Sequence, residues 1–317
     1  MERMRIMVGV DGSTVAREAL RWAVGLGETF GAEIVAVHAV GLLEDVHDPE
    51  AAAGSWRAGL RDLVERSWCA GLTQSGCAHR VVVRDGPPVD VLLAAAHDEH
   101  ADLLIVGSRG VGATNPALAL GSTSLRVLQS ARLPVLVVPE PRPGAPSAAG
   151  LDLRRVLVGV DRSEPSLAAL GLAADLAGAT GGSLSVVEVF GYVPPFPLGP
   201  ATAVSQRGEE QALEATYAPL EAEVRGIRDR GVRVQVIVRS GEPAPTLLEV
   251  ADDVGAGLVV VGTRARGDPA DPLLGSVART VVHQVRRPTL VVPAPGGRVD
   301  PDRADDHGEP APSGTGS

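Results

Sequence analysis

The sequence contains two copies of one pattern, and this repeat constrains the fold more than any other feature. The segment MVGVDGS at 7–13 returns as LVGVDRS at 157–163, and ADLLIVGSRG at 101–110 returns as AGLVVVGTRA at 256–265. Two further pairs are VVVRDGPPVDVLLAAA at 81–96 with VIVRSGEPAPTLLEVA at 236–251, and RLPVLVVP at 132–139 with RRPTLVVP at 286–293. A period of 150 to 155 residues indicates a duplicated domain, because the repeats of a solenoid span only about 20–50 residues.

Within each copy, short runs of Val, Ile and Leu alternate with stretches of helical character. The runs are continuously apolar, as expected of parallel strands that are buried on both faces. In the first copy the expected strands are Ile6–Val10, Glu33–Val40, Ala78–Arg84, Leu103–Gly107 and Val135–Val138. The expected helices are 14–28, one within 56–75, 88–99 and 121–131. This alternation predicts an α/β protein of two tandem doubly wound domains, each an open, mostly parallel five-stranded sheet with helices on both faces.

Two segments without helical or strand periodicity set the expected domain boundaries. A proline-rich stretch separates the copies and is typical of a semi-rigid linker. The residues after the second copy are rich in Pro, Gly and Asp, which predicts a disordered tail. The expected organisation is domain 1 at 1–140, linker at 141–152, domain 2 at 153–293 and tail at 294–317.

The charge balance disfavours nucleic acid and membrane surfaces as partners. The chain carries 39 acidic and 29 basic residues, a net charge of −10, and no basic block. Such a chain is poorly suited to bind phosphate backbones or anionic lipids. Cys69 and Cys77 match no metal or disulfide spacing, and no run approaches 18 apolar residues, so we expect a cytoplasmic protein.

Every basic residue among the 29 is Arg, and the sequence contains no Lys. A P-loop needs its Lys at the β- and γ-phosphates, and pyridoxal and Schiff-base enzymes need a Lys amine. All of these classes are excluded. A nucleotide bound by this chain would be held by backbone N–H groups, hydroxyls and Arg.

The residues best suited to bind a ligand follow the expected strands. Ligands of open α/β sheets bind beyond the carboxyl ends of the strands, at the point where the strand order reverses. Asp11 follows the first strand, His38 and Ala39 close the second, and Gly107-Ser108-Arg109-Gly110 follows the fourth, ahead of a helix that opens at Gly121. Glycines let a backbone approach an anion, and a helix N-terminus attracts phosphate. The same pattern recurs in the second copy, which predicts a phosphate site.

Taken together, these segments resemble the universal stress protein family in its tandem two-domain form, over residues 5–139 and 154–293. The most specific motif is G-x-x-G, nine residues, then G-[S/T]. The resemblance implies ATP or AMP bound by the first-strand Asp, the end of the second strand and the glycine loop. The candidate residues in the first copy are Gly9, Asp11, Ala39, Gly107, Gly110, Gly121 and Ser122, and we add Arg109 and Ser124 as phosphate donors. In the second copy they are Gly159, Asp161, Val189, Gly262, Gly275 and Ser276.

Both copies depart from that motif. The first has ten residues between its second and third glycines, where the family has nine. The second has nine, but Ala265 replaces the second glycine. An extra loop residue changes the closure entropy by well under ~1 kcal/mol, whereas an Ala in left-handed geometry costs about 1–2 kcal/mol. We therefore expect nucleotide chiefly in the first copy.

No group of residues predicts catalysis or a metal site. His97 and His100 are three apart, but the solvated end of a helix explains them better than a metal ion does. His38 is expected to line the site or to pack, since Glu188 stands at its place in the second copy. The hypothesis is an ATP-binding sensor or regulator, with or without Mg²⁺, that acts on an unidentified protein partner. The alternatives are a slow ATPase or nucleotidyl-transferring enzyme of the same fold, or a nucleotide-free interaction module.

The final strands, Val135–Val138 and Thr289–Val292, are short and apolar and are expected at a sheet edge. An uncovered apolar edge favours pairing with another strand. We therefore expect the two copies to dock through these strands, and residues 1–140 alone to pair with a second copy. A homodimer of the whole chain is a further option.

Overall fold

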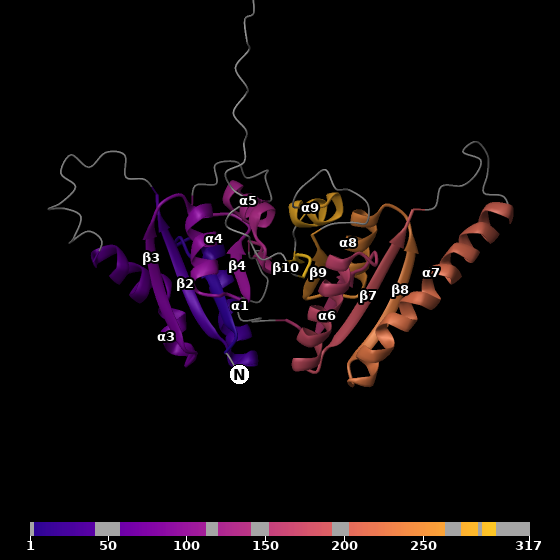
Figure 1. Cartoon of the computed structure of the whole chain (residues 1–317), viewed down its shortest axis with the longest axis horizontal. Coiled ribbons are helices and arrows are strands. Elements are labelled where there is room, and N and C mark those ends of the chain that lie inside the picture. Colours follow the sequence, from indigo (N-terminus) through magenta and orange to yellow (C-terminus); the bar gives the residue numbers. More distant parts are fainter. Residues whose placement is uncertain are drawn as a thin grey trace, which may run out of the picture.

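The computed structural model describes residues 3–41, 58–111, 120–140, 152–191, 203–263, 274–284 and 287–295. Within them the chain forms a ten-stranded sheet in the order β3-β2-β1-β4-β5-β10-β9-β6-β7-β8 (Figure 1). The first half supplies β1 (Arg5–Gly9), β2 (Glu33–Val40), β3 (His79–Asp85), β4 (Leu103–Gly107) and β5 (Val135–Val138). The second half supplies β6 (Arg155–Gly159), β7 (Ser183–Phe190), β8 (Arg233–Ser240), β9 (Leu258–Gly262) and β10 (Thr289–Val292).

The strands of each half pair in parallel, and the halves meet antiparallel through their last strands. In β5 and β10, Leu136 pairs with Leu290 and Val135 with Val291. The expected docking through the final strands is therefore confirmed, and the two five-stranded sheets continue into one another. Each strand covers the edge that the other would expose.

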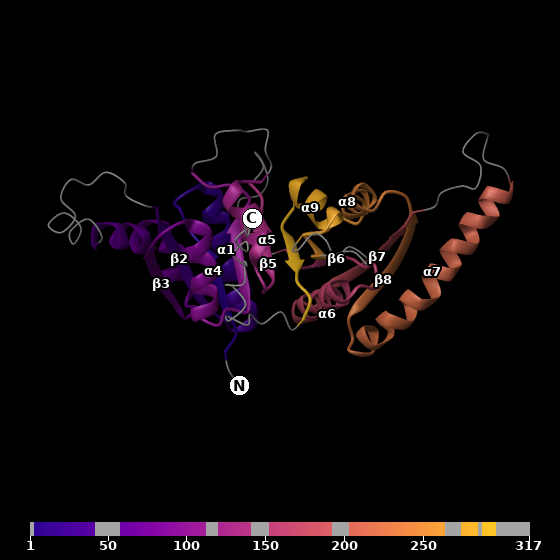
Figure 2. The same cartoon turned by 45° about the horizontal axis from the view of Figure 1, so that its top comes forward.

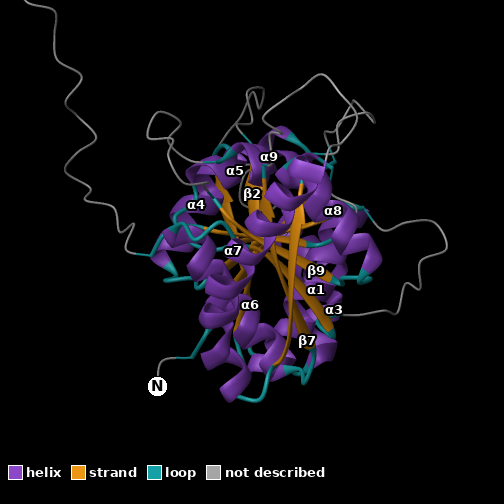
Figure 3. Cartoon of the chain, turned by 90° about the vertical axis from the view of Figure 1, so that its right-hand side faces the viewer, coloured by secondary structure: helices purple, strands orange, loops and turns teal. Residues whose placement is uncertain are grey.

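Helices cover both faces of the sheet (Figure 3). One face carries α1 (Thr14–Phe30), a π-helical turn η1 (Val64–Trp68), α3 (Ala70–Ser75), α6 (Glu164–Ala179) and α7 (Ala203–Asp229). The other carries α4 (Pro88–Asp98), α5 (Ser122–Ser130), α8 (Pro243–Asp253) and α9 (Ser276–His283). Successive side chains of a strand alternate between the faces, so Ile6 and Val8 join the first core and Met7 the second. Both cores run through both halves, which confirms the doubly wound α/β architecture.

The helices after β1 and β6 begin at serine N-caps, as expected. The Ser13 hydroxyl accepts a hydrogen bond from the Ala16 amide at 3.0 Å, and Ser163 accepts one from Ser166 at 3.4 Å. Pro165 occupies the first turn of α6, where its missing N–H costs nothing. These caps fix the turns that carry Asp11 and Asp161.

The region expected to hold one helix within 56–75 is more complex in the structure. Helical residues 58–63 continue into η1, which closes with a bond from the Cys69 amide to the Val64 carbonyl, and then into α3. The second half instead has the long α7, which runs beside β8 and beyond it (Figure 2). Residues 141–151 and 296–317, which make up most of the expected linker and tail, lie outside the described residues. None of the described helices combines the length and apolarity needed to span a membrane.

Candidate functional site

The strand order reverses between β1 and β4 in the first half, and a cavity of about 680 Å³ lies there, beyond the strands' carboxyl ends. All nine first-half candidates line this one cavity: Gly9, Asp11, Ala39, Gly107, Arg109, Gly110, Gly121, Ser122 and Ser124. The tertiary structure thus assembles residues that are more than 100 positions apart in the sequence. The volume is within the usual range for sites that take small molecules and cofactors.

Asp11 ties the turn after β1 to the glycine loop. One carboxylate oxygen accepts from the Ser13 amide at 3.0 Å, and the other accepts from the Val111 amide at 2.9 Å. A Cβ on Gly110 would lie only 2.5 Å from Asp11 Oδ2, so a side chain at this position would displace the carboxylate. Each carboxylate oxygen has two lone pairs and so keeps acceptor capacity toward a ligand.

The candidate glycines differ in whether the fold needs them. A Cβ on Gly107 would lie 2.9 Å from Val15 Cγ1, so this glycine lets β4 pack against α1. Gly9 packs against Leu92 in the same way, at 3.2 Å. At Gly121 a Cβ would meet the Ser108 carbonyl oxygen at 3.5 Å, an ordinary contact, and the backbone has a φ of −76° that any residue adopts. The fold itself therefore does not require glycine at position 121.

The start of α5 offers polar groups to the cavity. Ser122 and Thr123 line it, and the first amides of a helix have no partner within the helix. The Ser124 hydroxyl instead donates to the Gly107 carbonyl at 2.6 Å, so its proton holds the end of β4 in place. Among the described residues, the buried Nε of Arg109 has no hydrogen-bond partner. This end of the cavity is rich in donors, as an anion requires.

The other end of the first-half cavity is aromatic and apolar. Trp68 lines it, together with Pro88 and the end of β2. Its indole lies edge-on to the His38 ring, with centroids 5.0 Å apart and an interplanar angle of 84°. His38 Nδ1 lies 2.8 Å from the Val10 carbonyl, and because a carbonyl can only accept, this nitrogen carries the proton. Sequence reasoning missed Trp68, since no motif connects it with the strand ends.

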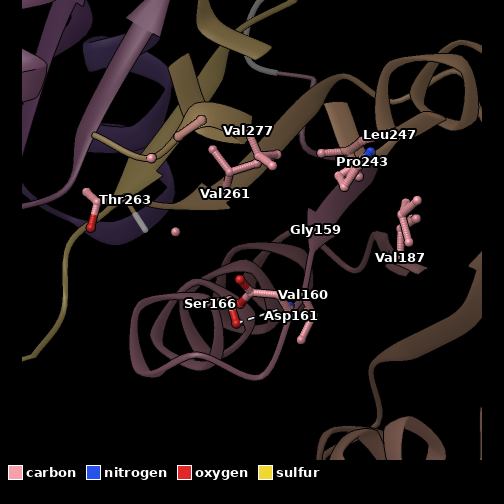
Figure 4. Close-up of a pocket in the computed structure, with 14 residues that line it drawn as sticks. Gly159, Val160, Asp161, Ser166, Val187, Pro243, Leu247, Val261, Thr263 and Val277 are labelled. Atoms are coloured by element: carbon pink, nitrogen blue, oxygen red, sulfur yellow. Dashed lines mark hydrogen bonds between the residues drawn. The ribbon is translucent and has the colours of Figure 1, made fainter. Parts of the chain in front are cut away.

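The equivalent cavity in the second half is much smaller, at about 120 Å³ (Figure 4). Five second-half candidates line it: Gly159, Asp161, Val189, Gly262 and Gly275. Ser276 is not among the lining residues, and Ala265 lies outside the described residues. At Gly262 a Cβ would come within 2.7 Å of the Ser166 amide nitrogen, so this glycine is needed for packing against α6.

The second cavity has also lost polar groups. Val277 and Ala278 replace Thr123 and Ser124 at the helix start, so α9 offers fewer hydroxyls than α5. Much of the remaining wall is aliphatic, as the side chains of Val187, Leu247 and Val261 show in Figure 4.

An ion pair stands in the second half where the first half has glycine and an aromatic pair. Arg162 occupies the position of Gly12 with a φ of 61°, in the left-handed region that favours glycine. Its guanidinium donates to Glu188 Oε2 at 2.8 Å and to the Thr216 carbonyl of α7 at 3.0 Å. Burial raises the pKa of the Glu188 carboxyl, and the bond from Arg162 only partly opposes this. The pair links the turn after β6 to both β7 and α7.

The reactive groups outside the two cavities include the buried Cys69 thiol. Burial, reinforced by Glu65, raises the pKa of the Cys69 thiol to about 11, so this sulfur stays protonated at neutral pH. No group of three or more His, Cys, Asp or Glu side chains within the described ranges is arranged to hold a metal ion.

Comparisons with known proteins agree over both halves. A model of the universal stress protein family matches residues 2–139 and again 152–293. A universal stress protein of Mycolicibacterium smegmatis is 32% identical over 310 residues, which cover 90% of this chain and 96% of that protein. Universal stress protein Rv1996 of Mycobacterium tuberculosis is 31% identical over 314 residues, with 92% and 95% covered. The crystal structure of a universal stress protein from Archaeoglobus fulgidus superposes with a TM-score of 0.64 at 22% identity, covering 92% of this chain and 96% of that one, and supports the fold.

Proposed function

This chain belongs to the universal stress protein family, and we propose that its first half binds ATP and that the protein acts as a nucleotide-dependent sensor or regulator. One observation carries the proposal. The first-half cavity joins a donor-rich end at the glycine loop and α5 to an aromatic end at β2 and η1, within about 680 Å³. A nucleotide has the same division, with an anionic end and a flat aromatic end.

The absence of a side chain at position 121 supports a ligand at this place. The fold tolerates a Cβ there, as the 3.5 Å and 3.6 Å clearances to Ser108 and Arg109 show. A residue without a side chain at the start of a helix lets a phosphate approach the free amides of the first turn. In this assignment the amides and hydroxyls of Ser122 and Thr123, with Arg109, hold the phosphates.

Asp11 and Ala39 hold the rest of the nucleotide in this proposal. The Asp11 carboxylate, fixed by two amides, accepts from ribose hydroxyls, and the backbone at Ala39 contacts the base. Mg²⁺ would enter together with the phosphates, whose oxygens it prefers. Its contribution would be to neutralise phosphate charge.

The proposed role is that of a binder and not of an efficient enzyme. Phosphoryl transfer needs an oriented nucleophile and cationic groups that stabilise the transition state. The groups assigned here hold a ground-state phosphate, and binding ground and transition states equally gives affinity without rate. ATP would instead favour one conformation of the chain, which a partner protein recognises.

The test uses a matched pair of variants, Gly121→Val and Gly275→Val, at equivalent positions in the two halves. Isothermal titration calorimetry with ATP should show one site per chain in the unmodified protein. Gly121→Val should weaken binding by about a hundredfold or more, whereas Gly275→Val should leave the dissociation constant within about twofold, since ATP occupies only the first half.

Three results would overturn the proposal. They are no ATP binding by the unmodified chain, undiminished affinity in Gly121→Val, or sustained ATP hydrolysis that this variant abolishes. A radiolabelled ATP assay with Mg²⁺ or Mn²⁺ measures hydrolysis, with about one turnover per second as the lower end of the ordinary enzyme range. Circular dichroism of each variant checks that the fold is intact.

A further inference from the structure

A π-helical turn of the backbone places Trp68 at the first-half cavity. Trp68 is the last residue of this turn, η1, and it lines the first-half cavity beside Val37, His38 and Ala39. Single π-turns within helices are rare and occur frequently at functional sites. The turn directs a large side chain from a helix on one face of the sheet to the strand ends.

Gly12 creates the space that the indole fills. Any Cβ at position 12 would lie 2.6 Å from Trp68 Cε2 and 2.9 Å from its Nε1, and the φ of +80° at Gly12 also favours glycine. Every other residue type at position 12 would displace the indole from the cavity wall.

His38 fixes the indole from a second side. Its ring is held by the bond from Nδ1 to the Val10 carbonyl, and it meets Trp68 in the edge-to-face geometry that aromatic pairs prefer. Trp68 is therefore positioned before any ligand arrives, so little conformational entropy remains to be lost on binding.

The second half has neither the glycine nor the histidine that positions Trp68. Arg162 stands in place of Gly12 and Glu188 in place of His38, and the two form an ion pair. The duplication thus compares two versions of one site, in which a preorganised aromatic wall accompanies the large cavity and an ion pair accompanies the small one.

We infer that Trp68, positioned by Gly12 and His38, is the residue that selects a purine base. The inference rests on the proposed function, since it assigns the base end of the same site. Aromatic side chains bind nucleobases by stacking, and a larger ring system gives a larger stacked area. ATP and GTP should therefore bind more tightly than CTP or UTP. The affinity for inorganic tripolyphosphate, which has no base, should not depend on Trp68.

The experiment titrates ATP, CTP and tripolyphosphate into the full-length chain and three variants. Trp68→Leu should weaken ATP binding by about tenfold or more, leave tripolyphosphate unchanged and reduce the ATP-over-CTP preference to less than about twofold. Trp68→Phe keeps an aromatic ring and should restore most of the ATP affinity. Trp22→Phe is the control, because it removes a buried indole of α1 that does not line the cavity.

A fluorescence measurement keeps the inference testable if Trp68→Leu does not fold. The chain has three tryptophans, so the double variant Trp22→Phe/Trp56→Phe leaves Trp68 as the only one. Its emission should change on addition of ATP and stay constant with tripolyphosphate. The inference fails if Trp68→Leu binds ATP within twofold of the unmodified chain, or if saturating ATP leaves this emission unchanged. If the unmodified chain binds no ATP, the proposed function itself fails.

Discussion

The two halves of this molecule share a scaffold and differ at the site. Each places an Asp after its first strand, and the two carboxylates accept amide hydrogen bonds of the same length, 3.0 Å from Ser13 and from Ser163. Yet the cavity beside Asp11 measures about 680 Å³ and the one beside Asp161 about 120 Å³. A duplicated fold can therefore keep its strands and caps while one copy loses the space for a ligand.

The residues that differ between the two sites lie at a helix start, in a turn and near the end of a strand. In the second half, aliphatic side chains replace hydroxyls at the helix start, and the Arg162–Glu188 pair links the turn to α7. Core strands are constrained by packing on both faces, whereas residues at strand ends and turns are freer to change.

After Gly121→Val, the next largest predicted effect concerns the glycine loop. Gly110→Ala should weaken ATP binding by about thirtyfold, roughly 2 kcal/mol, because the new Cβ would lie 2.5 Å from Asp11 Oδ2 and displace that carboxylate from the Val111 amide. The matched variant Ala265→Gly gives the second half the G-x-x-G sequence of the first. It should create no second ATP site in calorimetry. A second bound ATP would show that the loop alone accounts for the difference in ATP binding between the halves.

A change at Arg162 tests the ion pair. Arg162→Gly relieves the strain of a left-handed backbone at a residue other than glycine. It also leaves Glu188, whose side chain is 14% exposed, without its cation. We expect unfolding by urea to show a loss of about 2 kcal/mol, because an uncompensated buried charge outweighs the relief of strain. The double variant Arg162→Gly/Glu188→Gln should recover most of this loss. Equal stability of Arg162→Gly and the unmodified chain would show that the ion pair does not stabilise the fold.

The two N-caps offer a smaller comparison. Ser13→Ala should cost about 1 kcal/mol, the usual value for an N-cap hydroxyl. Ser163→Ala should cost somewhat more, since its hydroxyl also donates to the Asp161 carboxylate at 2.5 Å. Chemical denaturation of both variants gives the two values, and a larger loss at Ser13 would contradict this order.

The smallest predicted effect is a pH dependence confined to the second half. Because burial raises the pKa of Glu188 in the folded chain, the folded state holds this proton to higher pH than the unfolded state does. The unmodified chain should therefore lose stability relative to Glu188→Gln as the pH rises from the ordinary Glu pKa of about 4.3 through the raised value. The difference should be constant above that window. A difference that moves in the opposite direction would mean that Arg162 outweighs burial.

Much of the fold and part of the site could be predicted from the sequence. The strands Glu33–Val40, Leu103–Gly107 and Val135–Val138 have the bounds expected from their apolar runs. Ser13 and Ser163 cap their helices as expected, since an N-cap acts through its own helix. Convergence of the strand ends on one place follows from the topology of parallel sheets, which is why all nine first-half candidates line one cavity.

Other features depended on contacts that no sequence pattern encodes. Gly107 looked like an adaptation for an anion, but its lack of a side chain makes room for Val15. Ser124 looked like a phosphate donor, but its proton holds the Gly107 carbonyl. Whether a glycine or a hydroxyl serves the fold or a ligand depends on what lies opposite it in space.

The sequence by itself determined the duplication, the α/β class, the capped helices and the edge of the sheet where the first-half cavity lies, because each follows from local periodicity or from a rule of topology. Only the tertiary structure decided that Trp68 reaches the site over Gly12, that Asp11 bonds to the loop at Val111, and that Arg162 meets Glu188 and α7. These pairs are 26 to 100 residues apart or depend on one π-turn in a helix. Side chains at such separations are brought together by the folded sheet, so their partners are fixed by packing.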